Sequence, residues 1–335
     1  APICKKNSEG RDMIFKNAFH LLVDNFLLTY KFLLYKIFVG VIVLALSAAL
    51  VYPTLNMFFS SQPFLDVVTL FNEFFKALTT GDVEFLNGFA ELLQEHMDTL
   101  GSFIAAKTPN IVFFVVAVVI ILLVGKFLDG IGNFAFGALI GDKMSSYAKT
   151  SFFSAYISNL GRASLWQVIY VPLTFVYDVV VLGLCYAVLI ILLNIISFAV
   201  VAAVAALMFS VALFLCAQAV KLTLFNNVVP AFVTEKTNLR GAWKNTFSFR
   251  KERFSCLFST YLVTCLLILC LNVLFAVSTF GAGLLITVPM SYLMLISIQF
   301  VSYYTYGKRK YFLGKDKIVQ PEQSDEDDFY ENFEI

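Results

Sequence analysis

Residues 166–220 decide the fold class, and they read WQVIYVPLTFVYDVVVLGLCYAVLIILLNIISFAVVAAVAALMFSVALFLCAQAV. The run is almost wholly apolar and more than twice the ~20 residues that one helix needs to cross the hydrocarbon core of a bilayer. It must therefore fold back on itself, and Asn194 is the polar residue where we expect the turn. The sequence predicts two membrane-spanning helices here, over residues 166–193 and 195–220.

The composition of the whole chain is that of a membrane protein. Hydrophobic residues make up 59% of the 335 residues and charged residues only 14%, against about 25% charged in an ordinary soluble domain. The sequence therefore predicts an all-α, polytopic integral membrane protein with six transmembrane helices. The four further spans are expected over residues 37–59, 111–128, 255–277 and 284–306.

Nearly all lysine and arginine residues fall in segments that six spans would place on one side of the membrane. Of the 24, only Lys76 and Lys107 lie in the long connection 60–110, which carries seven acidic residues. Basic residues accumulate in cytoplasmic segments, so this connection is predicted to be extracytoplasmic and both termini cytoplasmic. The N-terminal residues lack the pattern of a cleaved signal peptide, and the first span is expected to be retained. We expect a multi-pass protein of a bacterial plasma membrane.

Residues 60–110 are expected to form an amphipathic helical hairpin. Apolar residues recur at helical spacing over residues 63–78 and again after Asp82, which can cap the second helix. Two such helices would bury their apolar faces on each other, on the span bundle or on a protein partner. The segment 63–105 is therefore either a helical cap or a recognition surface.

Two cytoplasmic segments flank the early spans. Residues 1–36 place polar side chains at intervals of four, typical of an amphipathic helix in the headgroup plane or of an extension of the first span. Residues 129–165 are rich in Gly and Ser, and are expected to form ordinary cytoplasmic helices, with a re-entrant or interfacial helix pair as the alternative. Their glycines would either allow backbones to approach closely or interrupt helices: Gly130, Gly132, Gly137 and Gly141.

The cytoplasmic loop 221–254 is basic and carries a short amphipathic pattern after Asn238. Cations of this kind attract anionic lipid headgroups, although the positive-inside bias alone would also account for them. The tail 307–335 passes from a basic cluster into an acidic end that is expected to be disordered. The candidate headgroup-binding residues of the loop are Arg240, Lys244, Arg250, Lys251 and Arg253.

Asp178 is the strongest candidate for an intramembrane site, because a carboxylate at membrane depth costs about 2.5–3.5 kcal/mol even on lenient scales. It would serve either as a proton- or cation-linked site or as a hydrogen-bonded packing group. No basic residue is expected at comparable depth, so an ion pair is not predicted. Pro172, one to two turns earlier, is expected to bend the helix. The remaining polar candidates within the spans are Asn194, Gln218, Asn272 and Gln299.

Catalytic and metal-binding patterns find little support. His20 and His96 are the only histidines and are predicted on opposite sides of the membrane, which argues against a His-based metal site. None of the six cysteines lies in the outer connection, so no disulfide framework is expected. We therefore predict a protein that is not an enzyme and has no metal, no cofactor and no nucleic-acid partner.

The C-terminal third, from NNVVPAFVTEKTNLRGAWKNTFSF to GAGLLITVPMSYL, resembles six-span bacterial membrane proteins related to the glycerophosphodiester-phosphodiesterase membrane-domain superfamily. Pro230, Glu235, Ala242, Gly283 and Pro289 carry the resemblance, and Thr246 stands where a serine is typical. The resemblance implies membrane residence and an association with transport or envelope processes.

The expected function is that of a non-enzymatic, transport-related component or membrane partner subunit. It would use the span bundle, the outer hairpin and the basic loop as interaction surfaces, with the lipid bilayer and a protein at 63–105 as partners. The alternative is a self-contained proton-coupled carrier of a small solute or lipid that uses Asp178.

Overall fold

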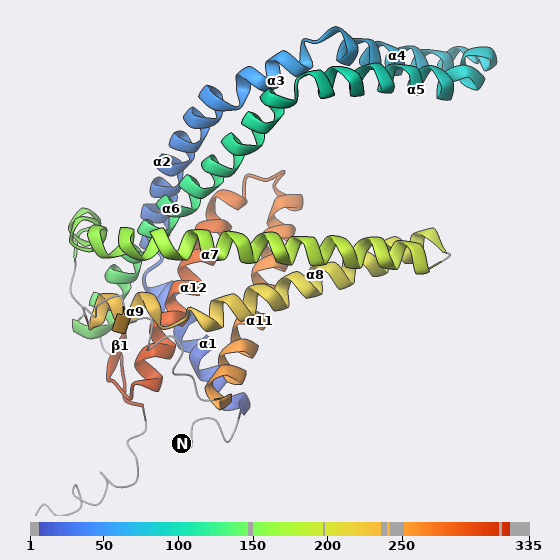
Figure 1. The fold of residues 1–335 in the computed structure, drawn as a ribbon. Coiled ribbons are helices and arrows are strands. Elements are labelled where there is room, and N and C mark those ends of the chain that lie inside the picture. Colours follow the sequence, from blue (N-terminus) through green and yellow to red (C-terminus); the bar gives the residue numbers. More distant parts are fainter. Residues whose placement is uncertain are drawn as a thin grey trace, which may run out of the picture. The chain divides into compact units, whose positions relative to one another are not determined.

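The computed structural model describes residues 7–146, 150–196, 198–235, 240–241, 251–314 and 317–321 (Figure 1). The chain divides into two compact units: residues 1–37 with 127–335, and residues 38–126. Within the described residues, six helices are long and apolar enough to cross a membrane. The prediction of a predominantly helical, multi-pass membrane protein with six spans is therefore confirmed.

The boundary between the units falls inside α2 (Leu27–Leu50), after residue 37. The unit of residues 38–126 contains the part of α2 beyond that point, then α3 (Tyr52–Phe59), α4 (Gln62–Thr80), α5 (Val83–Ala106) and the first half of α6 (Thr108–Ser146). Gly81, with φ of 74°, ends α4, and the Asp82 side chain caps α5 by accepting a hydrogen bond from the Phe85 amide at 3.2 Å. The helices α4 and α5 pack on each other through Phe74 and Phe89, whose ring centroids lie 4.3 Å apart.

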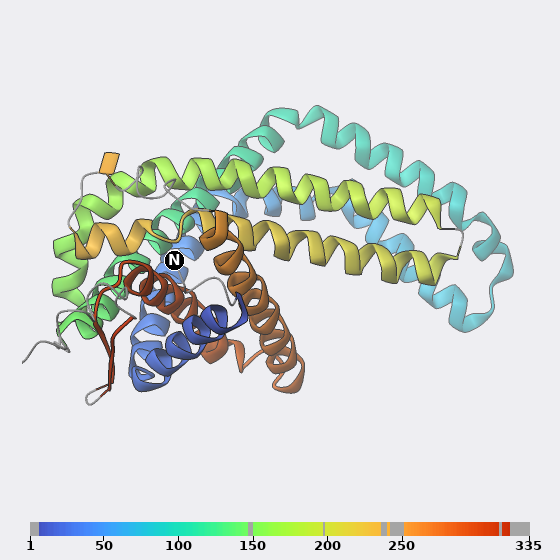
Figure 2. The ribbon, with the colours of Figure 1, turned by 90° about the horizontal axis from the view of Figure 1, so that it is seen from below.

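The other unit contains α1 (Asn7–Asp24), the second half of α6, α7 (Phe152–Ile195), α8 (Ala199–Leu224), α9 (Val228–Thr234), α11 (Lys251–Ser278) and α12 (Leu284–Tyr306). The long helices α7 and α8 run side by side as an antiparallel pair in both views (Figures 1 and 2). The helix α11 packs across α8, and α1 packs against α12 and α11. In Figure 1, α11 and α12 run across the α7–α8 pair rather than along it.

Several helices extend beyond the predicted spans. The last span matches residues 284–306, but α7 begins at Phe152 rather than at residue 166, and it continues through Pro172. At ~1.5 Å per residue its 44 residues extend over ~66 Å, more than the ~40–45 Å of a whole bilayer. Part of α7 must therefore project beyond the hydrocarbon core or run obliquely within the membrane.

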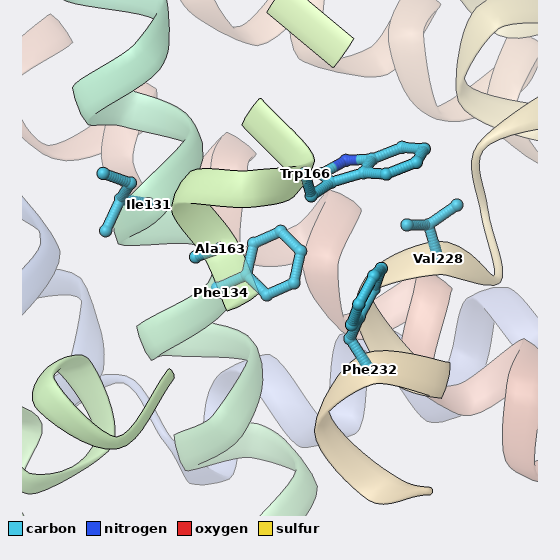
Figure 3. Packing of buried hydrophobic residues seen from close by; sticks show 6 residues of the cluster. All are labelled: Ile131, Phe134, Ala163, Trp166, Val228 and Phe232. Atoms are coloured by element: carbon cyan, nitrogen blue, oxygen red, sulfur yellow. The ribbon is translucent and has the colours of Figure 1, made fainter. Parts of the chain in front are cut away.

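The most deeply buried part of the molecule is the end of α6, residues 130–144. Figure 3 shows Phe134 and Ile131 of this segment beside Trp166 and Ala163 of α7 and Val228 and Phe232 of α9. The segment was expected to form ordinary cytoplasmic or interfacial helices, but it continues α6 into the protein core. Its glycines allow close packing: a Cβ on Gly132 would lie 2.2 Å from Cε1 of the Tyr35 ring.

The N-terminal helix α1 is tied to the segment after α12. A short antiparallel β-hairpin, β1 (Tyr311–Gly314) with β2 (Lys317–Val319), was not predicted by the all-α interpretation. The Asn17 amide donates to the Tyr311 hydroxyl at 3.0 Å, and burial raises the pKa of that phenol above its ordinary value. Ile14 and Ala18 of α1 are fully buried. This face of α1 therefore packs on protein, and the headgroup-plane location remains a prediction for its other faces.

Candidate functional site

Asp178 does not stand alone: it bonds across the α7–α8 pair. Its Oδ1 atom lies 2.7 Å from Nζ of Lys221 and accepts a longer bond, 3.4 Å, from the Gln218 amide. Gln218 and Lys221 are three residues apart on α8 and therefore share a face of that helix. The expectation that no ion pair forms was wrong, because α8 continues past residue 220 and carries Lys221 within the helix.

The positions of Asp178 and Lys221 along the antiparallel α7–α8 pair could have indicated this contact. The helix α7 ends at Ile195 and α8 begins at Ala199, so Asp178 lies 17 residues before the end of α7 and Lys221 lies 22 residues after the start of α8. In an antiparallel helix pair, residues equally distant from the turn lie at similar levels. A lysine also has a long apolar stem, so its ammonium group can reach a position several ångströms away from its own backbone.

Further polar contacts join α7 to α8 beside this ion pair and nearer the turn between the two helices. The Tyr177 hydroxyl donates to the Ala217 carbonyl at 2.7 Å, and the Ser210 hydroxyl donates to the Cys185 carbonyl at 3.1 Å. Hydrogen bonds between membrane helices contribute about 0.6 kcal/mol on average. The Asp178–Lys221 pair is thus one of several contacts that hold two otherwise apolar helices in a fixed register.

The other predicted polar residues do not gather around Asp178, apart from Gln218. Asn194 is exposed and its amide bonds within its own helix, to the Ile190 carbonyl at 2.8 Å. The Asn272 amide donates to the Ser291 hydroxyl at 3.4 Å, between α11 and α12. Gln299 is half-buried on α12. Apart from Asp178 and Gln218, which bond to each other, the candidates lie at separate places in the described structure and do not form a single binding site.

A buried polar cluster that the sequence did not reveal lies where α8, α11 and α12 meet. Asn226 is fully buried and donates from its amide to the Ser302 hydroxyl at 2.9 Å, while the Tyr261 hydroxyl donates to its carbonyl oxygen. We call these three residues the Asn226 cluster. Buried amides need such partners, since an unpaired one is costly. In the sequence, Asn226 lies beside Asn227 just before Pro230, so the stretch has the pattern of a surface loop.

The predicted headgroup-binding residues are described only in part. Lys244 and Arg250 lie outside the described residues. Arg240 is exposed, and Lys251 begins α11. The Arg253 guanidinium lies over the Tyr306 ring, 5.2 Å from its centroid, near the ends of α11 and α12. Arg253 thus packs against the last residue of a span.

The helix α4 leaves a broad apolar face exposed. Four residues at helical spacing on this helix are between 40% and 62% exposed, and the α4–α5 pair also carries the acidic residues of the connection. Such a face is covered either by lipid or by another protein. The four residues are Val68, Phe71, Phe75 and Leu78.

The described residues contain no group of three or more His, Cys, Asp or Glu side chains close enough to hold a metal ion. Comparison with models of known protein families, with curated proteins and with solved structures found no match. The resemblance to the glycerophosphodiester-phosphodiesterase membrane-domain superfamily therefore stays a prediction, and the candidate sites are interpreted from their own geometry.

Proposed function

We propose that this membrane protein is not an enzyme and acts as a partner subunit or transport-related component. In this proposal both termini face the cytoplasm of a bacterial cell, and the α4–α5 pair lies outside. The support for the orientation is the concentration of basic residues outside the connection 60–110.

The observation that carries the proposal is the pairing of Asp178 with Lys221 and Gln218. A carrier that moves protons needs a carboxyl group that gains and loses its proton during transport. The Asp178 carboxylate is instead engaged by two side chains of α8, the Lys221 ammonium at 2.7 Å and the Gln218 amide at 3.4 Å. The pair is therefore better suited to holding α7 against α8, which leaves the surfaces of the protein as the sites of its function.

The α4–α5 pair is the surface best suited to a partner. It combines the exposed apolar face of α4 with an excess of acidic over basic residues in the connection 60–110. Acidic side chains disfavour contact with anionic headgroups, so a protein partner with basic residues around an apolar patch fits this surface better than lipid does.

The proton-coupled carrier remains the second candidate, because the ion pair is not sealed from its surroundings. The side chains of Asp178 and Lys221 are 22% and 15% exposed. An ion pair at membrane depth with this access could bind a solute of mixed charge after a local rearrangement.

Proton flux separates the two candidates. Wild-type protein and the Asp178→Asn variant would be reconstituted in liposomes that hold a pH-sensitive dye, and a potassium diffusion potential would drive proton entry. A subunit whose Asp178 is structural should give the same slow flux for both proteins. Faster, potential-dependent flux in the wild type than in Asp178→Asn would overturn the proposal in favour of the carrier.

A mass measurement tests the partner directly. Protein extracted in mild detergent from its native membrane should have a larger protein mass, by light scattering, than protein made in a foreign host. Phe75→Glu should reduce the native mass to that of the isolated chain, while Gln94→Glu, at an exposed polar position of α5, should not. Equal masses from both sources would contradict the partner role.

The orientation has its own test. A cysteine at Gln94 should react with a membrane-impermeant maleimide added to intact cells, and a cysteine at Lys310 should react only after lysis, because the two are predicted on opposite sides. Labelling of both from outside would show that the orientation is wrong.

A further inference from the structure

A small cavity lies where the ends of α9, α11 and α12 come together. It has a volume of about 190 Å³, below the ~300–1,000 Å³ of sites for drug-sized ligands but sufficient for a single compact group. Its lining is polar and aromatic, although it adjoins three helices of an apolar protein. The lining residues are Asn227, Glu235, Arg253, Tyr303, Tyr306, Gly307 and Arg309.

One arginine of the cavity is held in place by protein contacts. Arg309 donates from Nη2 to Oε1 of Glu235, and the Tyr303 hydroxyl donates to the same oxygen. The Arg309 guanidinium also lies 5.3 Å from the centroid of the Tyr303 ring. These contacts neutralise Glu235, the one carboxylate among the described lining residues. Because a guanidinium has five N–H donors, Arg309 retains donors for a further partner.

The backbone after α12 turns Arg309 toward the cavity. Lys308 has a positive φ of 51°, and the amides of Lys308 and Arg309 bond back to the carbonyls of Thr305 and Tyr304. This is a Schellman motif, in which glycine is the usual residue at the left-handed position. A lysine is unusual at this position, because its Cβ crowds the backbone in the left-handed region. The helix end therefore has a fixed conformation that places Arg309 beside Tyr303.

The second arginine has no carboxylate partner within the described residues. The Arg253 guanidinium lies over the face of the Tyr306 ring. Stacking of this kind fixes the plane of a guanidinium while leaving its N–H groups at the edge available. Among the described residues that line the cavity, one positive charge is thus not compensated, and an aromatic ring orients it. Edge donors of arginine match the geometry of phosphate oxygens.

The position of the cavity at the end of a span indicates the source of its ligand. It lies at the last turn of α12, one of the six candidate spans, where the tyrosines give way to Lys308, Arg309 and Lys310. Tyrosines and basic residues at the end of a span mark the headgroup region of a bilayer. We propose that the cavity binds the phosphate group of an anionic phospholipid, with Arg253 and Arg309 as its donors. This site goes beyond the proposed partner role and does not depend on it.

Binding by the full-length protein in detergent tests the proposal. The probes are dihexanoyl phosphatidylglycerol, dihexanoyl phosphatidylcholine, glycerol 3-phosphate and inorganic phosphate, titrated against a thermal-shift or thermophoresis signal. We expect saturable binding of the anionic lipid. Arg253→Gln should weaken it about tenfold or more, because a charge-assisted bidentate contact is lost. Lys310→Gln removes the same charge from an exposed position outside the cavity, and should change the affinity less than about twofold.

The arms of the experiment distinguish the sources of the phosphate. Binding of the anionic lipid alone identifies a headgroup site, whereas equal binding of glycerol 3-phosphate or inorganic phosphate identifies a site for soluble phosphates. If Arg253→Gln does not fold, Arg253→Lys keeps the charge but loses the planar donors and should still weaken binding. Equal affinity for the zwitterionic lipid, or equal effects of the Arg253 and Lys310 variants, would overturn the proposal.

Discussion

The end of α6 is rich in small residues and is buried, whereas the second half of α7 is strongly apolar and is exposed. Residues 130–144 include four glycines and two alanines and are almost wholly buried. Residues 175–195 form one of the most hydrophobic stretches of the chain, yet Val181 is their only fully buried side chain. In a soluble protein these positions would be reversed, because there the apolar residues form the core.

The difference in burial between the two regions arises because lipid is the solvent of membrane helices. Lipid tails are as apolar as leucine, so helices in a bilayer gain little from burying apolar surface against one another. They associate instead where small residues allow close packing and where polar groups find partners. The end of α6 meets the first condition through Gly132 and Gly137. The α7–α8 pair meets the second through Asp178 and Lys221.

The largest effect is expected from filling the space at Gly132. A leucine there would overlap the Tyr35 ring, which the Tyr35 hydroxyl fixes by donating to the Leu128 carbonyl at 2.6 Å. We expect a loss of about 3 kcal/mol or more and little monodisperse protein on size exclusion in mild detergent. Gly183→Leu on α7, where nothing lies within 4 Å of the added Cβ, should give normal yield. Equal losses for the two variants would contradict the distinction between the two regions.

An intermediate effect is expected at the Asn226 cluster. Asn226→Ala leaves Tyr261 and Ser302 without their amide partner, and it should lower the free energy of unfolding by about 2 kcal/mol. Asn194→Ala removes an exposed side chain that bonds only its own helix and should cost less than about 0.5 kcal/mol. Thermal unfolding in one detergent compares them. A larger loss at Asn194 would show that the polar residues in the apolar run matter more than the buried cluster.

The smallest effect is expected for shortening an apolar side chain on the exposed surface of α7. Leu182 is 58% exposed, so Leu182→Ala should change the free energy of unfolding by less than about 0.5 kcal/mol. The same substitution at Leu257 of α11, which is fully buried, should cost about 2–5 kcal/mol. Unfolding followed by tryptophan fluorescence measures both. Similar losses would mean that α7 packs on protein where the structure leaves it exposed.

The candidate sites were predicted less well than the spans. Asp178 was identified because a carboxylate within an apolar run is conspicuous in any sequence. The sequence pattern places its partner Lys221 in a loop, because hydropathy gives no sign of how far a helix continues past its apolar part. Asn226 has no signal in the sequence for a similar reason: a polar residue at a span end has the same pattern whether it faces water or two other helices.

Arg253 also shows that the local sequence does not reveal contacts between distant residues. Its charge and its place in a basic loop predicted contact with headgroups. Nothing in the local sequence indicates that Arg309, more than fifty residues later, lines the same cavity. A cavity between three helix ends depends on contacts between residues far apart in the chain, and these have no local signature.

The chain alone was sufficient to establish a helical membrane protein with six spans, a turn near Asn194 and a cap at Asp82. These features depend on local properties, since each helix in lipid must satisfy its own backbone hydrogen bonds and each span must be apolar over its length. Which helices meet was decided only in three dimensions, as the contacts of Asp178, Asn226 and Arg253 show. Lipid and apolar side chains are nearly equivalent surroundings for a helix, so the choice of neighbours depends on shape and on a few polar contacts that hydropathy does not reveal.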